Sequence, residues 1–114
     1  MRIKIIDKKI SKDELQEIAK EFYVVMIKGV VDVERDILAV GGEYHMDANN
    51  VLIENNSKQQ NIWGFNWYLD KSTEESIEYV SLINIRPAQG NRVMEVQDSS
   101  LRDKMKSIIL KYLS

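Results

Sequence analysis

The spacing of hydrophobic residues changes several times along the chain, and each change predicts a new element. The segment from Arg2 to Asp7 is short and rich in isoleucine, as is typical of a first strand. Ser11, followed three residues later by Glu14, matches a capping box, because these side chains satisfy free amides at a helix start. Apolar residues then recur at spacings of three and four, which predicts a helix with one apolar side. They are Leu15, Ile18, Ala19, Phe22 and Met26.

Beyond Lys28 the apolar period falls from that of a helix to two. Val31 and Val33 then lie on one side of an extended chain, with polar residues on the other, which predicts a strand. The charged residues 34–36 are suited to a turn, and the apolar residues 37–40 resume a strand that runs into Gly41 and Gly42. We expect a hairpin here.

A second hairpin is predicted around residues 55–57. Asparagine and serine tolerate the backbone of tight turns, and the flanking segments 51–54 and 62–69 both have strand composition. In the later segment, alternate residues form an apolar face that we expect to be core, with Asn66 on the opposite face. The apolar face consists of Trp63, Phe65, Trp67 and Leu69.

The last third of the chain predicts one more strand and a final helix. Residues 77–85 have strand composition, and Pro87, which has no backbone N–H, marks where that strand ends. A helix is expected after residues 98–100, because apolar residues recur on one stripe. These are Leu101, Met105, Ile108, Ile109 and Tyr112.

The predicted order of elements is strand, helix, about five strands and helix. Consecutive strands joined by short turns pair antiparallel, so we expect an α+β fold. It would have an antiparallel, meander-like sheet of about five or six strands, with two helices packed on one face. At 114 residues the chain fits a single domain spanning residues 1–114.

Composition and charge narrow the classes of function. The chain has no cysteine, which excludes a disulfide, a thiolate nucleophile and cysteine-ligated zinc, and fits a reducing compartment. A formal net charge of −2 gives no general attraction to phosphate backbones, so we expect no nucleic-acid partner. Charges interrupt the apolar residues at the amino end, so we expect no signal peptide and no membrane span. The expected location is the cytoplasm.

Three stretches of the chain carry a family resemblance. They run from Val31 through Gly41 and Gly42 to His45, from Ile62 to Gly64, and from Asn84 to Arg92. Together they resemble an uncharacterised family of small bacterial and archaeal proteins, classed as a domain of unknown function. The resemblance implies a single α+β domain in a prokaryotic cytoplasm, and it implies no activity, substrate or cofactor.

The first candidate site follows the two glycines. If the strand continues past them, Glu43, His45 and Asp47 point to the same side, because side chains alternate along a strand. One imidazole and two carboxylates could then hold a divalent metal ion or perform acid–base chemistry near neutral pH. The alternative is a solvated polar face, or a histidine whose nitrogens are satisfied by neighbours.

The second candidate is a polar loop that includes the only proline. Its guanidinium and amide groups could bind a carboxylate or a phosphate through paired hydrogen bonds. The alternative is a connection whose side chains fix its own backbone. The candidate ligand-binding residues are Asn84, Arg86, Gln89, Asn91 and Arg92.

These candidates lead to three hypotheses about function. The first is a small binding module that holds a small anionic ligand or a divalent metal ion near His45 and Arg86. The second is a small hydrolase or isomerase in which His45 is the base and Arg86 or Arg92 stabilises negative charge. The third is a non-catalytic interaction protein, expected as a homodimer.

Overall fold

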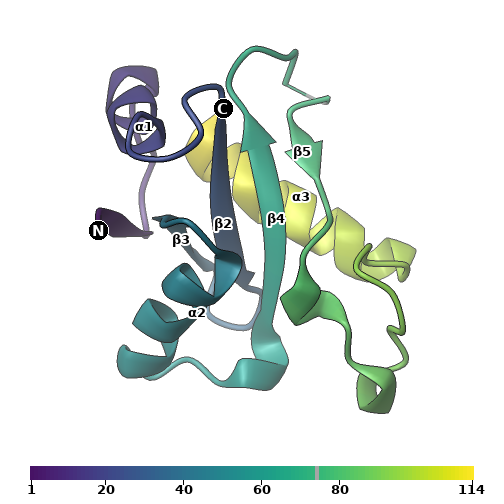
Figure 1. Cartoon of the computed structure of the whole chain (residues 1–114). Coiled ribbons are helices and arrows are strands. Elements are labelled where there is room, and N and C mark those ends of the chain that lie inside the picture. The colour runs from purple at the N-terminus through teal and green to yellow at the C-terminus, as the bar shows by residue number, and fades with distance from the viewer. Residues whose placement is uncertain (74) are drawn as a thin grey trace.

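An antiparallel sheet lies at the centre of the molecule, as the computed structural model shows for residues 1–73 and 75–114 (Figure 1). Its five strands stand in the order β1-β3-β2-β4-β5. The strands are β1 (Ile3–Ile6), β2 (Met26–Asp32), β3 (Ile37–Gly41), β4 (Ile62–Tyr68) and β5 (Ile77–Glu78). The helices are α1 (Lys12–Ala19), α2 (His45–Glu54) and α3 (Ser99–Leu113). The predicted α+β class with an antiparallel sheet is confirmed.

The first hairpin is confirmed and forms the middle of the sheet. Strands β2 and β3 pair antiparallel, while β1 adds to the outer side of β3 and β4 to the outer side of β2. In the turn, Oδ1 of Asp32 accepts hydrogen bonds of 3.0 Å from the backbone N–H groups of Glu34 and Arg35. Asp36 completes the turn with a positive φ of 59°.

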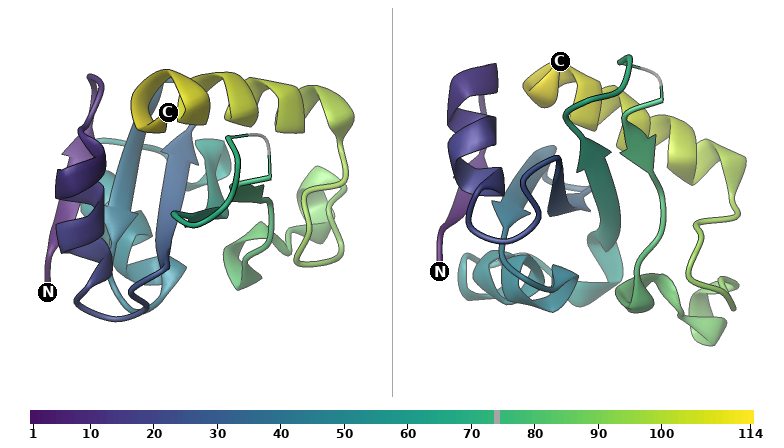
Figure 2. Two further views of the ribbon diagram at one scale, coloured as in Figure 1. Left: turned by 90° about the horizontal axis from the view of Figure 1, so that it is seen from above. Right: turned by 45° about the horizontal axis from the view of Figure 1, so that its top comes forward.

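Helices cover both faces of the sheet, as Figure 2 shows for α2 and α3. On one face, α1 and α3 pack against the aromatic side of β4, so the predicted core face is confirmed. On the other face, Ala48 and Leu52 of α2 pack against Val30, Ala39 and Ile62. The two predicted helices do share one face, and α2 is a third helix that the hydrophobic pattern did not predict.

The second predicted hairpin is wrong, because residues 51–54 belong to helix α2. Residues 55–57 end that helix instead of joining two strands. Asn56 adopts a positive φ of 78°, and the N–H of Ser57 donates to the carbonyl of Leu52 at 3.0 Å. The tolerance of asparagine for this conformation therefore serves a helix end.

The first helix is confirmed but is shorter than its apolar stripe suggested. Ser11 caps it, since its hydroxyl accepts the N–H of Glu14 at 3.1 Å. The helix ends at Ala19, and the chain then turns through Val24, whose φ is 64°. Phe22 is consequently exposed, and Met26 opens β2; the prediction that both lie on the helix is wrong.

The strand predicted over residues 77–85 is confirmed only for Ile77 and Glu78. The chain then crosses the face of β4 and makes a 3₁₀ turn at Leu82–Asn84. Gly64 permits this close approach, because a Cβ added there would lie 2.5 Å from Cβ of Ser81. The segment 80–83 therefore lies on the same face of the sheet as α2.

The final helix is confirmed. Oδ1 of Asp98 accepts the N–H of Leu101 at 3.0 Å and so caps α3. Its predicted stripe faces the core, where Met105, Ile108, Ile109 and Tyr112 are buried. In the described part of the chain, no helix has the length and apolar character needed to cross a membrane.

Candidate functional site

Glu43, His45 and Asp47 do not share a strand face, so the predicted geometry of the first candidate is wrong. Helix α2 begins at His45, and the Asp47 carboxylate caps it. Oδ2 of Asp47 accepts the backbone N–H groups of Glu43 at 3.0 Å and of Tyr44 at 2.9 Å. Among the described residues, no three His, Asp or Glu side chains are placed to hold a metal ion.

His45 is a buried histidine at the first position of α2, and only 7% of it is exposed. Burial, followed by the positive charge of Lys28, lowers the pKa of its imidazole to about 4. The carbonyl of Phe65, the side chain of Asn66 and the charge of Glu78 oppose this shift, because they favour the charged ring. Its Nε2 lies 2.9 Å from the carbonyl oxygen of Phe65. A carbonyl can only accept, so Nε2 carries the proton and Nδ1 is an acceptor at neutral pH.

The guanidinium of Arg86 donates hydrogen bonds to backbone carbonyls of two separate segments of the chain. Its Nε donates to the carbonyl of Ile83, and its Nη1 to the carbonyl of Gln59, both at 2.9 Å. Its Nη2 donates to the carbonyl of Ile62. The guanidinium also lies over the ring of Trp63, 4.2 Å from the centroid, and its burial lowers the pKa of the group. These contacts leave it little capacity to bind an anion.

Asn84 acts as a substitute for a neighbouring strand. Its Oδ1 accepts the N–H of Gly64 at 2.8 Å, and its Nδ2 donates to the carbonyl of Gly64 at 3.0 Å. Nδ2 also donates to the carbonyl of Met94 at 3.2 Å. This buried amide therefore completes the edge of β4 just beyond the point where β5 turns away.

Asn91 organises the rest of the loop in the same way. Its Nδ2 donates to the carbonyls of Asn84, Val93 and Glu95 at 2.8, 2.9 and 3.1 Å. Its Oδ1 accepts the N–H of Gln97 at 3.0 Å. All of these partners are backbone groups, so the side chain fixes the course of the chain between β5 and α3.

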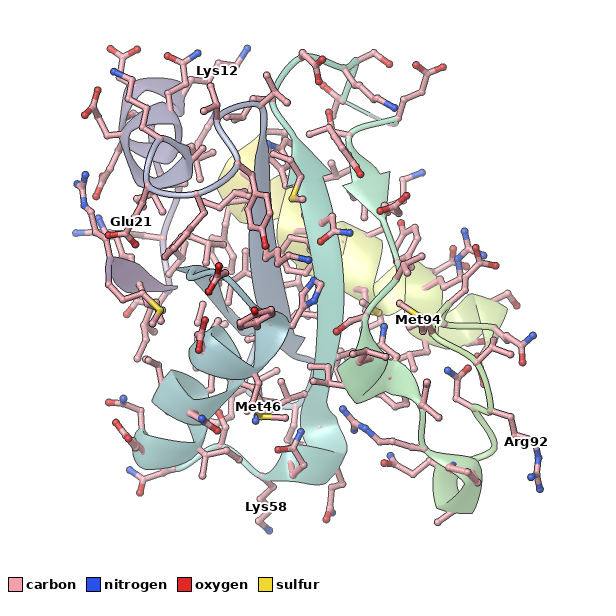
Figure 3. The ribbon with its side chains drawn as sticks, viewed as in Figure 1. Lys12, Glu21, Met46, Lys58, Arg92 and Met94 are labelled. Carbon is pink, nitrogen blue, oxygen red and sulfur yellow. The ribbon has the colours of Figure 1, made fainter. Side chains whose placement is uncertain are left out.

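The remaining two candidates of the loop differ from each other. Gln89 donates to the carbonyl of Gln60 at 3.1 Å and accepts from Arg86 at 3.3 Å. Arg92 is exposed and points outward from the loop in Figure 3. The structure therefore matches the alternative interpretation of the loop, in which its polar side chains fix its own backbone.

A pocket that the sequence did not predict lies between α2 and the segment 80–83. Its volume is about 480 Å³. Lys28 and Asn66 are cross-strand neighbours on β2 and β4 and form its floor, on the face opposite the aromatic core. Its walls come from the first turn of α2, from the segment 80–83 and from Met94. The wall residues are Tyr44, His45, Met46, Val80, Ser81, Leu82, Ile83 and Met94.

The rim of the pocket is apolar and faces solvent. Met46 and Met94 lie on either side of β4 in Figure 3, and both are substantially exposed. Leu82 is 72% exposed, and Tyr44 is 62% exposed. Exposed apolar side chains gathered at one opening are typical of a binding site, because scattered ones would not form a continuous surface.

Asn66, on the pocket floor, has an incomplete set of hydrogen bonds. It is 6% exposed, and its Nδ2 donates to Oε1 of Glu78 at 2.7 Å. Its Oδ1 is buried and has no partner among the described residues. An unpaired buried acceptor costs free energy, so it marks a place where a donor is missing.

Sequence reasoning identified only part of this pocket. His45 was a candidate, and Asn66 was placed on the correct face of its strand. Lys28, Leu82 and Met94 were missed, because their approach depends on a helix and a chain crossing that local patterns did not indicate. The polar residues at Lys28 and Asn66, in the middle of otherwise apolar strands, were the available sequence signal.

Comparison with known proteins identifies a family, but no activity is known for that family. The chain belongs to the family described as Protein of unknown function (DUF5674), whose model matches residues 4–112. No curated protein and no solved structure matches the chain. The family assignment agrees with the resemblance in the sequence and brings no activity with it.

Proposed function

We propose that this member of a family of unknown function is a small-molecule binding module, and that its pocket holds an organic anion with an apolar body. The observation that carries the proposal is the combination of apolar walls with the Lys28 ammonium at the floor. A volume of about 480 Å³ lies within the usual range for small-ligand sites.

The charge of the pocket favours an anion over a metal ion. Among the described residues, Lys28 forms no salt bridge, and its Nζ lies 5.3 Å from the centroid of the Tyr23 ring. Its charge also disfavours protonation of His45. The same positive charge repels a divalent cation and attracts a carboxylate.

The apolar rim supports an apolar ligand body. Methionine side chains adapt to ligands of different shape, and Met46 and Met94 lie at the opening together with Leu82. Covering these side chains with a ligand removes apolar surface from water, which contributes roughly 25 cal/mol per Å². The ligand would therefore combine a charged end near Lys28 with an apolar end at the rim.

The enzyme hypothesis has less support from the geometry. It requires Arg86 or Arg92 to stabilise negative charge near His45, but Arg86 is bonded to backbone carbonyls and neither arginine lines the pocket. The homodimer hypothesis stays a prediction, which the sedimentation behaviour of the protein would test. A dimer interface over Leu82 and Met94 would compete with the ligand for the same surface.

The test is a thermal-shift screen with small aliphatic and aromatic carboxylates, followed by calorimetric titration of the compounds that raise the melting temperature. A ligand that binds only the folded state stabilises it by mass action. We expect Lys28→Met to weaken binding at least tenfold, because loss of a desolvated charge contact costs about 1.4 kcal/mol or more.

Arg92→Ala is the matched control, since it removes one exposed positive charge outside the pocket. It should bind each carboxylate as the wild type does. The proposal is wrong if no carboxylate raises the melting temperature, or if Lys28→Met and Arg92→Ala weaken binding equally.

A further inference from the structure

The polar end of the pocket contains two hydrogen-bond acceptors that lack donors. The first is Oδ1 of Asn66. Its identity follows from chemistry, because Nδ2 must face the Glu78 carboxylate, which at neutral pH can only accept. The oxygen is therefore turned away from Glu78, and it has no partner among the described residues.

The second acceptor is Nδ1 of His45. Nε2 is committed as the donor to the carbonyl of Phe65, which fixes the tautomer of the neutral ring. Among the described residues, Nδ1 of the neutral ring receives no donor, and the neighbouring Asn66 side chain acts as an acceptor toward the charged ring. His45 and Asn66 both line the pocket, and their side chains lie close enough to interact.

Neighbouring side chains do not supply the missing donor. The Lys28 ammonium lies over the Tyr23 ring, and the Ser81 hydroxyl, which accepts the N–H of Ile83 at 3.2 Å, makes no hydrogen bond to Oδ1 of Asn66. Buried acceptors are normally satisfied by protein, by ordered water or by a ligand. A ligand with a hydrogen-bond donor could satisfy these acceptors, whereas a ligand without a donor would leave them unpaired.

We infer that the pocket selects carboxylic acids that carry an uncharged hydroxyl or amide N–H group next to the carboxylate, with 2-hydroxy acids bearing an apolar side chain as the class that fits best. The carboxylate lies near Lys28, the donor near Asn66 and His45, and the apolar side chain at Met46, as the lining residues allow. The inference rests on the proposed function and adds the identity of the ligand class.

The donor of the ligand is uncharged, because Lys28 lines the same pocket as both acceptors. At His45 the positive charge of Lys28 has a larger effect than the opposing charge of Glu78, so a ligand ammonium at the same place would meet a net repulsion. An α-amino acid is thereby disfavoured relative to the 2-hydroxy acid with the same side chain. Substitution of one atom in the ligand thus separates the two classes.

Three matched ligands test the inference: 3-phenyllactate has the hydroxyl, 3-phenylpropionate lacks it, and phenylalanine carries an ammonium in its place. Calorimetric titration of the wild type at neutral pH should show 3-phenyllactate binding about tenfold or more tighter than 3-phenylpropionate, as expected for a buried hydrogen bond that is otherwise unmade. Phenylalanine should bind more weakly than 3-phenyllactate.

Two variants assign the preference to Asn66. Asn66→Leu removes Oδ1 at similar volume and leaves only Nδ1 of His45 as an acceptor, so we expect the preference for 3-phenyllactate over 3-phenylpropionate to fall. Glu78→Gln removes the charge but keeps an acceptor for Nδ2 of Asn66, so it should retain the preference for the hydroxyl. The wild-type comparison of ligands does not depend on whether either variant folds.

The outcomes separate this inference from the proposed function. Equal wild-type affinity for 3-phenyllactate and 3-phenylpropionate, weakened in both cases by Lys28→Met, would overturn the selection of a donor and leave the anion pocket standing. A preference that is undiminished in Asn66→Leu would overturn the role of Asn66. Binding of none of the three ligands at millimolar concentration would contradict the inference and the proposed function together.

Discussion

The loop of residues 84–92 and the pocket beside α2 are both rich in polar side chains, yet they handle hydrogen bonds in opposite ways. Asn91 and Asn66 make the difference plain, because both are asparagines that are about equally buried. Every polar atom of the Asn91 amide is bonded to backbone, whereas Oδ1 of Asn66 has no partner among the described residues. Polar groups that satisfy each other stabilise a fold, and those left unpaired in a pocket are available to a ligand.

The largest effect on stability is expected from Asn91→Ala. It removes the partner of three carbonyls and one N–H group, so unfolding should become easier by about 3 kcal/mol. Urea unfolding followed by circular dichroism measures this change. Arg92→Ala, its exposed neighbour, should change the free energy of unfolding by less than about 0.5 kcal/mol. Equal effects of the two variants would contradict the structural role of the loop.

A slightly smaller loss of stability is expected from Arg86→Lys. Lysine keeps the positive charge but lacks the planar group that reaches the carbonyls of Ile83 and Gln59 while stacking on Trp63. The free energy of unfolding should fall by about 2 kcal/mol or slightly more. The same urea experiment checks it. If lysine preserved full stability, the side chain would act through its charge, and an anion-binding role for Arg86 would regain support.

The pH dependence of stability tests the burial of His45. Its pKa is about 4 in the folded protein and about 6.5 in the unfolded chain, so between these values the unfolded state binds the additional proton. The contribution of neutral His45 to the free energy of unfolding is therefore complete above pH 6.5, and it is lost as the pH falls towards 4. Between pH 7 and pH 5 the loss is about 2 kcal/mol.

His45→Gln isolates this contribution, because glutamine keeps an N–H donor for Phe65 and does not titrate. His45 is the only histidine of the chain, so the variant should lose less stability than the wild type between pH 7 and pH 5. Urea unfolding at the two pH values gives the comparison. The same loss in both proteins would mean that the ring is charged or exposed in the folded state.

The smallest effect is expected from Asn66→Leu. It removes one hydrogen bond to Glu78, but it also removes an unpaired buried oxygen from the floor of the pocket. The lost hydrogen bond destabilises the fold and the removal of the unpaired oxygen stabilises it, so the free energy of unfolding should change by less than about 1 kcal/mol. A loss as large as that of Asn91→Ala would show that Oδ1 of Asn66 is satisfied in solution and is not kept for a ligand.

The sequence predicted the elements whose patterns are local. Ser11 and Asp98 marked two helix starts, and the alternation from Trp63 to Leu69 placed the aromatic core correctly. Helix α2 was missed because Val51, Leu52 and Ile53 have strand composition, while the apolar pair Ala48 and Leu52, one helical turn apart, was not recognised. Packing of that pair against the sheet outweighs the local preference of β-branched residues.

The prediction of the candidate site failed for the same reason, because it depended on helix α2 and on its packing against the sheet. His45 was identified from its residue type, but its neighbours Glu43 and Asp47 were placed on a strand that does not exist. The residues that accompany it in the pocket, Lys28 and Met94, come from segments far away in sequence. Sequence alone could predict that polar groups lie on one face of the sheet, and it could not predict which of them satisfy each other.

The most direct test of the contrast between loop and pocket is a two-dimensional ¹H–¹⁵N NMR titration of the wild-type protein with 3-phenyllactate. We predict that the backbone amide signals of Lys28, Met46 and Asn66 shift with increasing ligand, while those of Arg86 and Asn91 stay in place. Shifts that centre on Arg86 and Arg92, or no shifts at millimolar ligand, would contradict the assignment of the pocket as the binding site.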